Sequence, residues 1–516
     1  MTVISPRPAP EGAADAAAAA GGFARVLRLR RGVEVVADPA ALVAGVADTV
    51  LLGHPWGRMR LRGLGEDVAA ALVTMAADGC AVRGGPDGGP VAARVHALLT
   101  ASVPFVARTD VEGATGLLLA VEPVSASARP LASPVLSPAT EVVLPRHAYV
   151  RRADADSGWS ASVLESPTAL HRAVLVEARV AGLVAAFGAR TPIADAAVSA
   201  GLPEAVALEV ASVLAAAGLL AVGEEREDDA TSLWGFHELL FHGLSRPGRH
   251  DHVTGGVYAH RDVPSPAALP AIAVVPDASP SSAGHAVDLP VPSFDDVVAA
   301  DPPFTAVLEG RRSVRRHERP LTVAALGEFL YRAARARRVL PAPDSPTGQA
   351  GVDRPYPMGG GLGELELCLA VRACDGLEPG AYRHDSAAHR LVRLDARQAD
   401  VDTLLAGAVR ATNGLGDPQV LVTVTSRVGR LTWKYSQIGY ALTLKHVGCL
   451  YQTGYLVAAA MGLGMCALGS GDVEAAGRAY GLSWPAETPV GEFLLGGGLL
   501  EPAAVEGFTD VVDAWR

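Results

Sequence analysis

The stretch that decides the fold is LTWKYSQIGYALTLKHVGCLYQTGYLVAAAMGLGMCALGSGD, residues 431–472. Its central part, residues 440–464, is long and mostly apolar. That composition predicts a helix that lies in a core or in a dimer seam. The segment therefore predicts a helix-centred domain near the C-terminus.

Strand-like and helical patterns surround this segment. ELELCLAV at 364–371 alternates in polarity, PQVLVTVTS at 418–426 reads as a second strand, and EFLLGGGL at 492–499 supplies a late strand. LGEFLYRAARA at 326–336 predicts a further helix. Beyond Phe304 the chain is therefore expected to be α+β, with the main boundary between Asp295 and Pro303.

The N-terminal half predicts smaller modules. Short β-like runs at 33–38 and 49–53 precede a helical pattern at 63–79. From His147 a strand-like stretch leads to helical patterns at 168–188 and 206–220, with PIADAAVSAGL between them. We expect a flexible tail over 1–22, an α+β module over 23–145, a winged-helix-like module over 146–230, a connector over 231–300 and the main domain over 301–516.

Composition restricts the classes of function. A net charge of −11 disfavours broad attachment to nucleic acid, and the apolar residues form no run long enough to cross a membrane. The N-terminus lacks the features of a signal peptide, and five cysteines without CxxC pairing favour reduced thiols. We expect a cytoplasmic enzyme or adaptor.

The histidines at 237, 242, 250 and 252 lack carboxylate or cysteine partners at a recognised spacing. They are better explained as packing, surface or interface residues, and no metal site is predicted.

Three segments carry candidate chemistry. Arg311, Arg312, Ser313 and Arg315 offer guanidinium forks and a hydroxyl suited to a phosphate, although such a run alone is more typical of a solvated face. YPMGGGLGELEL at 356–367 has glycines that let the backbone approach a flat ring, or that simply form a turn before a strand. Lys434 beside Tyr435 joins an ammonium to a phenol, and the cation favours the phenolate that proton abstraction requires.

Adjacent helical residues do not face the same way, so Lys434 and Tyr435 are expected in a loop or at a helix start.

These segments occur in an order that resembles nitroreductase-fold flavoproteins. More closely, residues 232–500 resemble the SagB-type peptide azoline dehydrogenases, beginning with FHELLFHGLSRPGRHDHVTGG. The resemblance implies an FMN-binding nitroreductase-like domain that acts as a homodimer on an azoline-containing precursor peptide, with a cyclodehydratase as partner. The N-terminal modules are then expected to bind this partner or the leader of the peptide.

The resemblance also implies roles for residues. Arg311, Arg312, Ser313 and Arg315 would hold the FMN phosphate and ribityl chain, and the loop with Pro357, Met358, Gly359, Gly360 and Gly361 would approach the flavin. Met358 replaces the usual serine, and His446 stands where relatives commonly carry an acidic residue. Gly469 and Ser470 would offer backbone N–H groups to the flavin pyrimidine edge, and Lys434 with Tyr435 would be the catalytic pair.

The expected reaction is oxidation of a thiazoline or oxazoline ring to its aromatic form, with a Cα proton lost to Lys434 and Tyr435 and a hydride equivalent passed to the flavin. Two alternatives remain open. One is an NAD(P)H-dependent nitro or quinone reductase that uses the same pocket. The other is a non-catalytic scaffold within a peptide-modifying complex.

Overall fold

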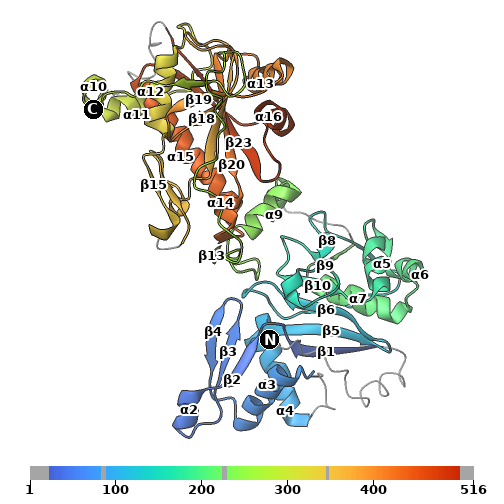
Figure 1. The fold of residues 1–516 in the computed structure, drawn as a ribbon. Helices are drawn as coiled ribbons and strands as arrows, with labels where there is room; N and C mark the ends of the chain where they lie inside the picture. Colours follow the sequence, from blue (N-terminus) through green and yellow to red (C-terminus); the bar gives the residue numbers. More distant parts are fainter. Residues whose placement is uncertain (1–22, 83–88, 224–228, 345–347, 500–516) are drawn as a thin grey trace, which may run out of the picture. The chain divides into compact units, whose positions relative to one another are not determined.

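The computed structural model describes residues 23–82, 89–223, 229–344 and 348–499. Two compact units divide the chain between Val253 and Thr254, inside the predicted connector. The predicted tail over 1–22 lies outside the described residues. Figure 1 labels many of the elements that are named below.

The N-terminal unit is built on a six-stranded antiparallel sheet. Its strand order is β1-β5-β6-β10-β9-β8. The strands, in that order, are β1 (Phe23–Leu29), β5 (Ala107–Gly113), β6 (Gly116–Pro123), β10 (His171–Leu175), β9 (Ser162–Glu165) and β8 (Tyr149–Arg152). Because β6 pairs with β10, the modules predicted over 23–145 and 146–230 share one sheet.

Two small three-stranded sheets accompany it. The first contains β2 (Glu34–Ala37), β3 (Val50–His54) and β4 (Gly57–Leu61), and the second has the order β11 (Thr191–Pro192), β7 (Glu141–Val143), β12 (Ala221–Val222). The helices of this unit are α2 (Pro39–Val43), α3 (Glu66–Asp78), α4 (Gly89–Ala97), α5 (Ala178–Ala186), α6 (Ile193–Ala200), α7 (Glu204–Ala216), α8 (Asp229–Ser232) and α9 (Phe236–Leu244). The helices α5, α6 and α7 adjoin the second small sheet, and the winged-helix assignment stays a prediction.

The helix predicted over 168–188 is wrong in its first part. His171–Leu175 forms β10, and every residue of this strand is buried between β6 and β9. A short apolar run reads the same way in a buried strand and in a buried helix, so periodicity could not separate them. The helix α5 begins only at Ala178.

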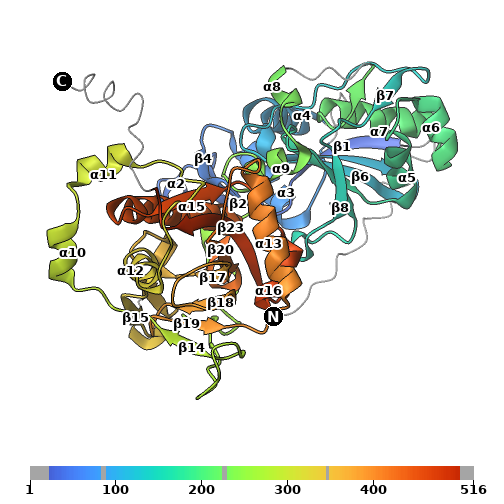
Figure 2. The same cartoon turned by 90° about the horizontal axis from the view of Figure 1, so that it is seen from above.

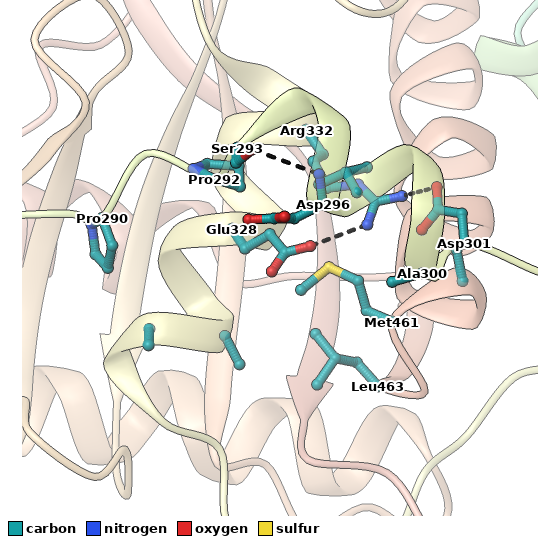
Figure 3. A pocket seen from close by; sticks show the side chains of 14 residues that line it. Pro290, Pro292, Ser293, Asp296, Ala300, Asp301, Glu328, Arg332, Met461 and Leu463 are labelled. Carbon is teal, nitrogen blue, oxygen red and sulfur yellow. Dashed lines mark hydrogen bonds and ion pairs between the residues drawn. The ribbon is translucent and has the colours of Figure 1, made fainter.

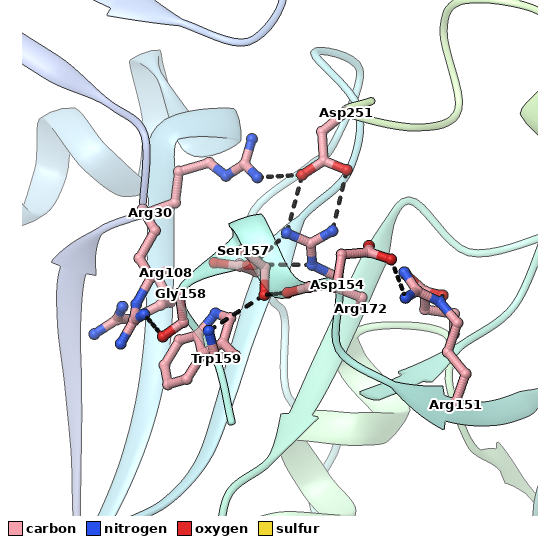
Figure 4. Close-up of polar contacts among 12 residues, drawn as sticks. Arg30, Arg108, Arg151, Asp154, Ser157, Gly158, Trp159, Arg172 and Asp251 are labelled. Carbon is pink, nitrogen blue, oxygen red and sulfur yellow. Dashed lines mark hydrogen bonds and ion pairs between the residues drawn. The ribbon is translucent and has the colours of Figure 1, made fainter. Parts of the chain in front are cut away.

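Buried ion pairs run across the large sheet of this unit (Figure 4). Arg172 donates to Glu122 at 2.6 Å and to Asp251 at 3.1 Å, and Arg30 pairs with the same Asp251. All four side chains are less than a tenth exposed. Each guanidinium therefore faces a carboxylate, which offsets part of the cost of removing it from water.

The C-terminal unit is a seven-stranded antiparallel sheet covered by helices on both faces. Its strands, in sheet order, are β14 (Ala286–Asp288), β19 (Arg390–Arg393), β18 (Gly380–Asp385), β17 (Leu365–Val371), β20 (Val420–Arg427), β23 (Glu487–Gly496) and β22 (Gly464–Leu468). Two small ribbons pair β13 (Gly255–Gly256) with β21 (Tyr435–Ser436) and β15 (Arg338–Leu340) with β16 (Gly351–Asp353).

Its helices form two layers around the sheet. They are α10 (Phe294–Ala300), α11 (Phe304–Gly310), α12 (Val323–Ala334), α13 (Gln398–Ala411), α14 (Gly429–Thr432), α15 (Gly439–Ala460) and α16 (Val473–Tyr480). Leu367 and Leu369 of β17 join the core with α12 and α15, whereas Cys368 and Ala370 join the core with α13 and α16. The segment 364–371, whose polarity alternates, thus forms a strand that is buried on both faces. Its side chains point alternately to the two sides of the sheet, and each side has its own core.

The central helix ends earlier than predicted. The apolar pattern extends to residue 464, but α15 ends at Ala460 and Gly462 has a φ of +65°. Glycine adopts this left-handed conformation at little cost and so permits the turn into β22. Within the described ranges no single helix is long and apolar enough to span a membrane. The helices Ile193–Ala200 and Glu204–Ala216 have the required length and composition only when they are taken together, and the chain bends by 117° between them.

Candidate active site

The glycine turn, Gly359–Gly361, lies directly against Lys434 and Tyr435. Gly360 has a φ of +63°, and a Cβ added to it would lie 2.9 Å from Lys434 Nζ and 3.1 Å from the Tyr435 hydroxyl. Both side chains are half-buried, and they lie between α14 and α15, as expected for a non-helical pair. The structure therefore joins two segments that are more than seventy residues apart in the sequence.

A third segment, β13 with Tyr258, covers the same pair. Gly256 pairs with Tyr435 in the β13–β21 ribbon, and the Tyr258 backbone N–H donates to the Lys434 carbonyl at 2.9 Å. Lys434 Nζ lies 5.0 Å from the centre of the Tyr435 ring and 5.5 Å from that of Tyr258. Two aromatic rings therefore lie within the distance at which a ring attracts a cation.

Arg430 fixes these segments to one another. Its side chain is 0% exposed, and its guanidinium donates to the carbonyl oxygens of Leu362, Ala350 (2.6 Å) and Pro266 (2.7 Å). Burial lowers the pKa of Arg430 to about 10, which leaves it charged at neutral pH. One cation thus holds together three segments: the end of the glycine turn, the residue before β16 and the segment after β13.

His446 on α15 holds the other end of the turn. Its Nε2 accepts from the Gly359 backbone N–H at 2.7 Å, and its Nδ1 lies 2.6 Å from Glu364 Oε1. His446 and Glu364 are both buried.

The arginine segment 311–315 lies beside the far part of α15. The Arg311 guanidinium is 5.1 Å from the centre of the Tyr455 ring, and Ser313 Oγ is 2.9 Å from the Tyr455 hydroxyl. That hydroxyl also accepts from the Ala467 backbone N–H of β22 at 2.8 Å. Burial raises the pKa of the neighbouring Cys466 thiol, and the positive charge of Arg315 opposes this shift.

Gly469 and Ser470 directly follow β22, and both are exposed. The remaining predicted residues lie at the entrance to the glycine turn, where Pro357 is exposed and Met358 packs partly against the core. The structure thus forms two groups. One contains the glycine turn with Lys434 and Tyr435, and the other joins 311–315 to β22.

The helix α15 connects the two groups. It begins three residues after Ser436, carries His446 against the turn, and carries Tyr455 against Ser313. At 1.5 Å per residue, these two contacts are separated by about 13 Å along the helix axis. A nucleotide that spans both groups would lie along this helix.

The structure also contains a cavity away from these residues. It has a volume of about 610 Å³ and lies between α10, α12 and the end of α15, where Arg332 pairs with Asp301 and Glu328 (Figure 3). None of the predicted site residues lines it. The cavity is therefore separate from the predicted flavin site.

Known protein families match two parts of the chain. Residues 308–497 match the model of the nitroreductase family. We call residues 308–497 the nitroreductase domain after this match. The match confirms the predicted nitroreductase-like α+β fold of this part of the chain and supports an oxidoreductase. Residues 142–251, which precede the nitroreductase domain, match the model of the cyanobactin oxidase ThcOx, and this confirms the predicted relationship to the SagB-type dehydrogenases.

Individual proteins are similar to the nitroreductase domain. A curated nitroreductase-family protein of Methanocaldococcus jannaschii is 27% identical over 188 residues, which are 36% of this chain and 86% of the relative. A nitroreductase-family structure from Ralstonia eutropha shares 21% identity, covers 46% of this chain and 99% of its own, and has a TM-score of 0.32. The Escherichia coli microcin synthetase McbBCD complex with truncated pro-MccB17 bound shares 18% identity over 44% of this chain and 77% of its own, with a TM-score of 0.30.

Three residues next to the site were not assigned from the sequence. They are Tyr258, Arg430 and Glu364. The Gly255–Gly256 pair before Tyr258 carried a signal, because a glycine pair permits the close approach that its pairing with Tyr435 requires. No such signal marked Arg430 and Glu364 in the sequence, because a charged residue beside a strand is usually exposed to solvent.

Proposed function

We propose that the protein is an FMN-dependent dehydrogenase that oxidises thiazoline or oxazoline rings to thiazole or oxazole in a ribosomally made peptide. The observation that carries this proposal is the contact of Lys434 and Tyr435 with the Gly359–Gly361 turn inside a nitroreductase-family domain. The match of residues 142–251 to the cyanobactin oxidase model supports a peptide as the substrate.

The donor groups of the domain fit a flavin nucleotide. Within the described part of the chain neither Arg311 nor Arg315 forms an ion pair with a carboxylate, so both can bind a phosphate. Arg312 and Ser313 complete this end, and the exposed backbone of Gly469 and Ser470 can donate to the pyrimidine edge. FMN, when bound, would supply the acceptor for the hydride equivalent.

Lys434 and Tyr435 supply the proton chemistry. The Tyr435 oxygen would remove the Cα proton of the azoline ring, and the Lys434 ammonium would stabilise the phenolate that accepts it. Gly360 keeps the space in front of both groups free of a side chain, so that a flat ring can approach them. The aromatic product ring provides the driving force.

The double variant Lys434→Ala/Tyr435→Phe tests this proposal. It should lower azoline oxidation by roughly 10³-fold, because it removes a general base and its stabilising cation, and it should keep its FMN. Lys445→Ala is the matched control, since Lys434 and Lys445 are the only lysines in the chain and Lys445 is exposed on α15. Unchanged turnover in the double variant would remove the pair from the mechanism.

Anaerobic mixing with an azoline peptide separates the proposal from its alternatives. Loss of the oxidised flavin absorbance on mixing supports the dehydrogenase. Bleaching by NADPH alone, with turnover of a nitroaromatic compound, would instead indicate a nitro or quinone reductase. A colourless protein that FMN does not reconstitute, yet that binds a cyclodehydratase, would indicate a scaffold.

We also propose that the domain is a homodimer that works with a cyclodehydratase. Phe294 and Val298 of α10 and Phe304 of α11 are 80%, 61% and 67% exposed, and both helices lie at the margin of the domain (Figure 2). Large apolar side chains that are this exposed are typical of an interface. Sedimentation of the full chain should give twice the 52.9 kDa chain mass.

A further inference from the structure

The glycine turn is anchored by a histidine and a carboxylate. His446 Nε2 accepts from the Gly359 N–H at 2.7 Å, so the ring proton is on Nδ1, which donates to Glu364 Oε1 at 2.6 Å. Glu364 is 0% exposed and lies three residues beyond the turn. The two hydrogen bonds therefore fix both the tautomer and the plane of the imidazole ring.

This anchor acts on the space in front of the catalytic pair. Gly359, which His446 holds, is bonded to Gly360, which lies against Lys434 Nζ and the Tyr435 hydroxyl. Arg430 holds Leu362 on the other side of the turn, so the turn has a fixed point at each end. Release of one point lets Gly360 shift relative to Lys434 and Tyr435.

We propose that His446, oriented by Glu364, is a positioning residue that sets the distance between the Gly359–Gly361 turn and the Lys434–Tyr435 pair. His446 touches neither Lys434 nor Tyr435 in any contact described above, and it acts through the Gly359 N–H. The role in turnover rests on the proposed function, whereas the anchoring of the turn does not.

Three variants at position 446 separate the two hydrogen bonds. Glutamine places an acceptor near the position of Nε2 and can keep the bond to Gly359. Asparagine places a donor near the position of Nδ1 and can keep only the bond to Glu364. Leucine keeps neither bond. Gln452→Ala is the control, because it changes an exposed residue of the same helix and leaves both hydrogen bonds of His446 in place.

Hydrogen exchange of the flavin-free full chain gives a readout that is independent of activity. The backbone amides of residues 358–364 should exchange about 10-fold faster in His446→Leu and His446→Asn than in the wild type, because the Gly359 N–H loses its acceptor. His446→Gln should stay near the wild-type rate. Equal exchange in all four proteins would overturn the anchor.

Turnover then tests the positioning role. We expect kcat to fall by roughly 10–100-fold in His446→Leu and His446→Asn, with KM within about 3-fold, because a misplacement of about 1 Å can have this effect. His446→Gln should restore most of kcat. Equal loss in all three variants, accompanied by lower melting temperatures and FMN content, would overturn positioning in favour of a structural role. If wild-type protein oxidises no azoline while the exchange series behaves as expected, the proposed function fails and the anchor stands.

Discussion

Buried arginines meet different partners in the large N-terminal sheet and beside the glycine turn. In the N-terminal unit Arg172 and Arg30 meet the carboxylates of Glu122 and Asp251 within or beside the large sheet. In the nitroreductase domain the buried Arg430 donates to backbone carbonyls of three separate segments. The first arrangement is an ion pair network in which carboxylates face the guanidinium groups, and in the second one guanidinium holds loops together through their carbonyl groups.

The difference predicts which charges can be replaced. An ion pair and an apolar pair of similar volume often give similar stability, because the attraction of the pair only offsets the desolvation of its members. An apolar side chain cannot replace a guanidinium that donates to carbonyl groups, because the carbonyl groups lose that donor and stay buried. Arg430 should therefore be much less replaceable than Arg172.

Loss of Arg430 should have the largest effect. Arg430→Met leaves the carbonyls of Leu362 and Ala350 without a donor within the described ranges and the Pro266 carbonyl with only the Ser265 hydroxyl at 3.4 Å. We therefore expect the free energy of unfolding to fall by about 3–5 kcal/mol. Azoline oxidation should be lost as well. Urea titration followed by circular dichroism measures the first effect, and Arg430→Lys is the control that keeps the charge. A midpoint within error of the wild type would contradict the comparison.

Arg172 gives the matched test in the N-terminal unit. Arg172→Met alone should cost about 3 kcal/mol, because it leaves Glu122 buried without its cation. In Arg172→Met/Glu122→Leu, Asp251 keeps Arg30, and the loss should shrink to about 1 kcal/mol. Binding of FMN, the proposed cofactor, should be unchanged in both variants. If the double variant is less stable than the single one, the paired charges are not replaceable either.

Glu492 is a buried carboxylate that has no cation partner among the residues that the structure describes. It is 4% exposed, its Oε1 has no hydrogen bond among the described residues, and burial, with the Asp472 charge, raises its pKa to about 7. The folded state thus keeps a proton that the unfolded chain releases near pH 4.5, so stability falls as the pH rises from about 4.5 to 7. Glu492→Gln should match the wild type at pH 4 and exceed it by about 1–3 kcal/mol at pH 8. Parallel stability curves of the two proteins between pH 4 and 8 would refute this.

The smallest effect is expected at Tyr455. Tyr455→Phe removes the hydroxyl that joins Ser313 to the Ala467 N–H, which should cost about 1 kcal/mol and weaken FMN binding by roughly 5-fold. Titration of the flavin-free protein with FMN measures this change. Phe493→Leu, in the same core but without a polar group, is a control for packing. Tighter FMN binding by Tyr455→Phe would exclude this hydroxyl from the phosphate end.

The sequence determined the local patterns. The alternation at 364–371 predicted β17, the apolar run at 440–464 predicted α15, and the position of Lys434 and Tyr435 before that run predicted a non-helical pair. These predictions succeeded because strand period, helix length and residue order are properties of neighbouring residues. The helix predicted over 168–188 failed at His171–Leu175, because only pairing with β6 and β9 makes that run a strand.

Only the tertiary structure decided which distant groups meet. The resemblance implied that the glycine turn and the Lys434–Tyr435 pair share one pocket. It did not imply that Arg430 and His446 hold the turn against the pair, nor that Tyr258 covers Lys434. These contacts depend on chain segments brought together by the sheet and by α15, and no spacing in the sequence encodes them. Charged side chains are normally solvated, so the sequence alone gives no reason to place Arg430 in the interior. Only the folded chain brings together three carbonyl groups that accept from its guanidinium.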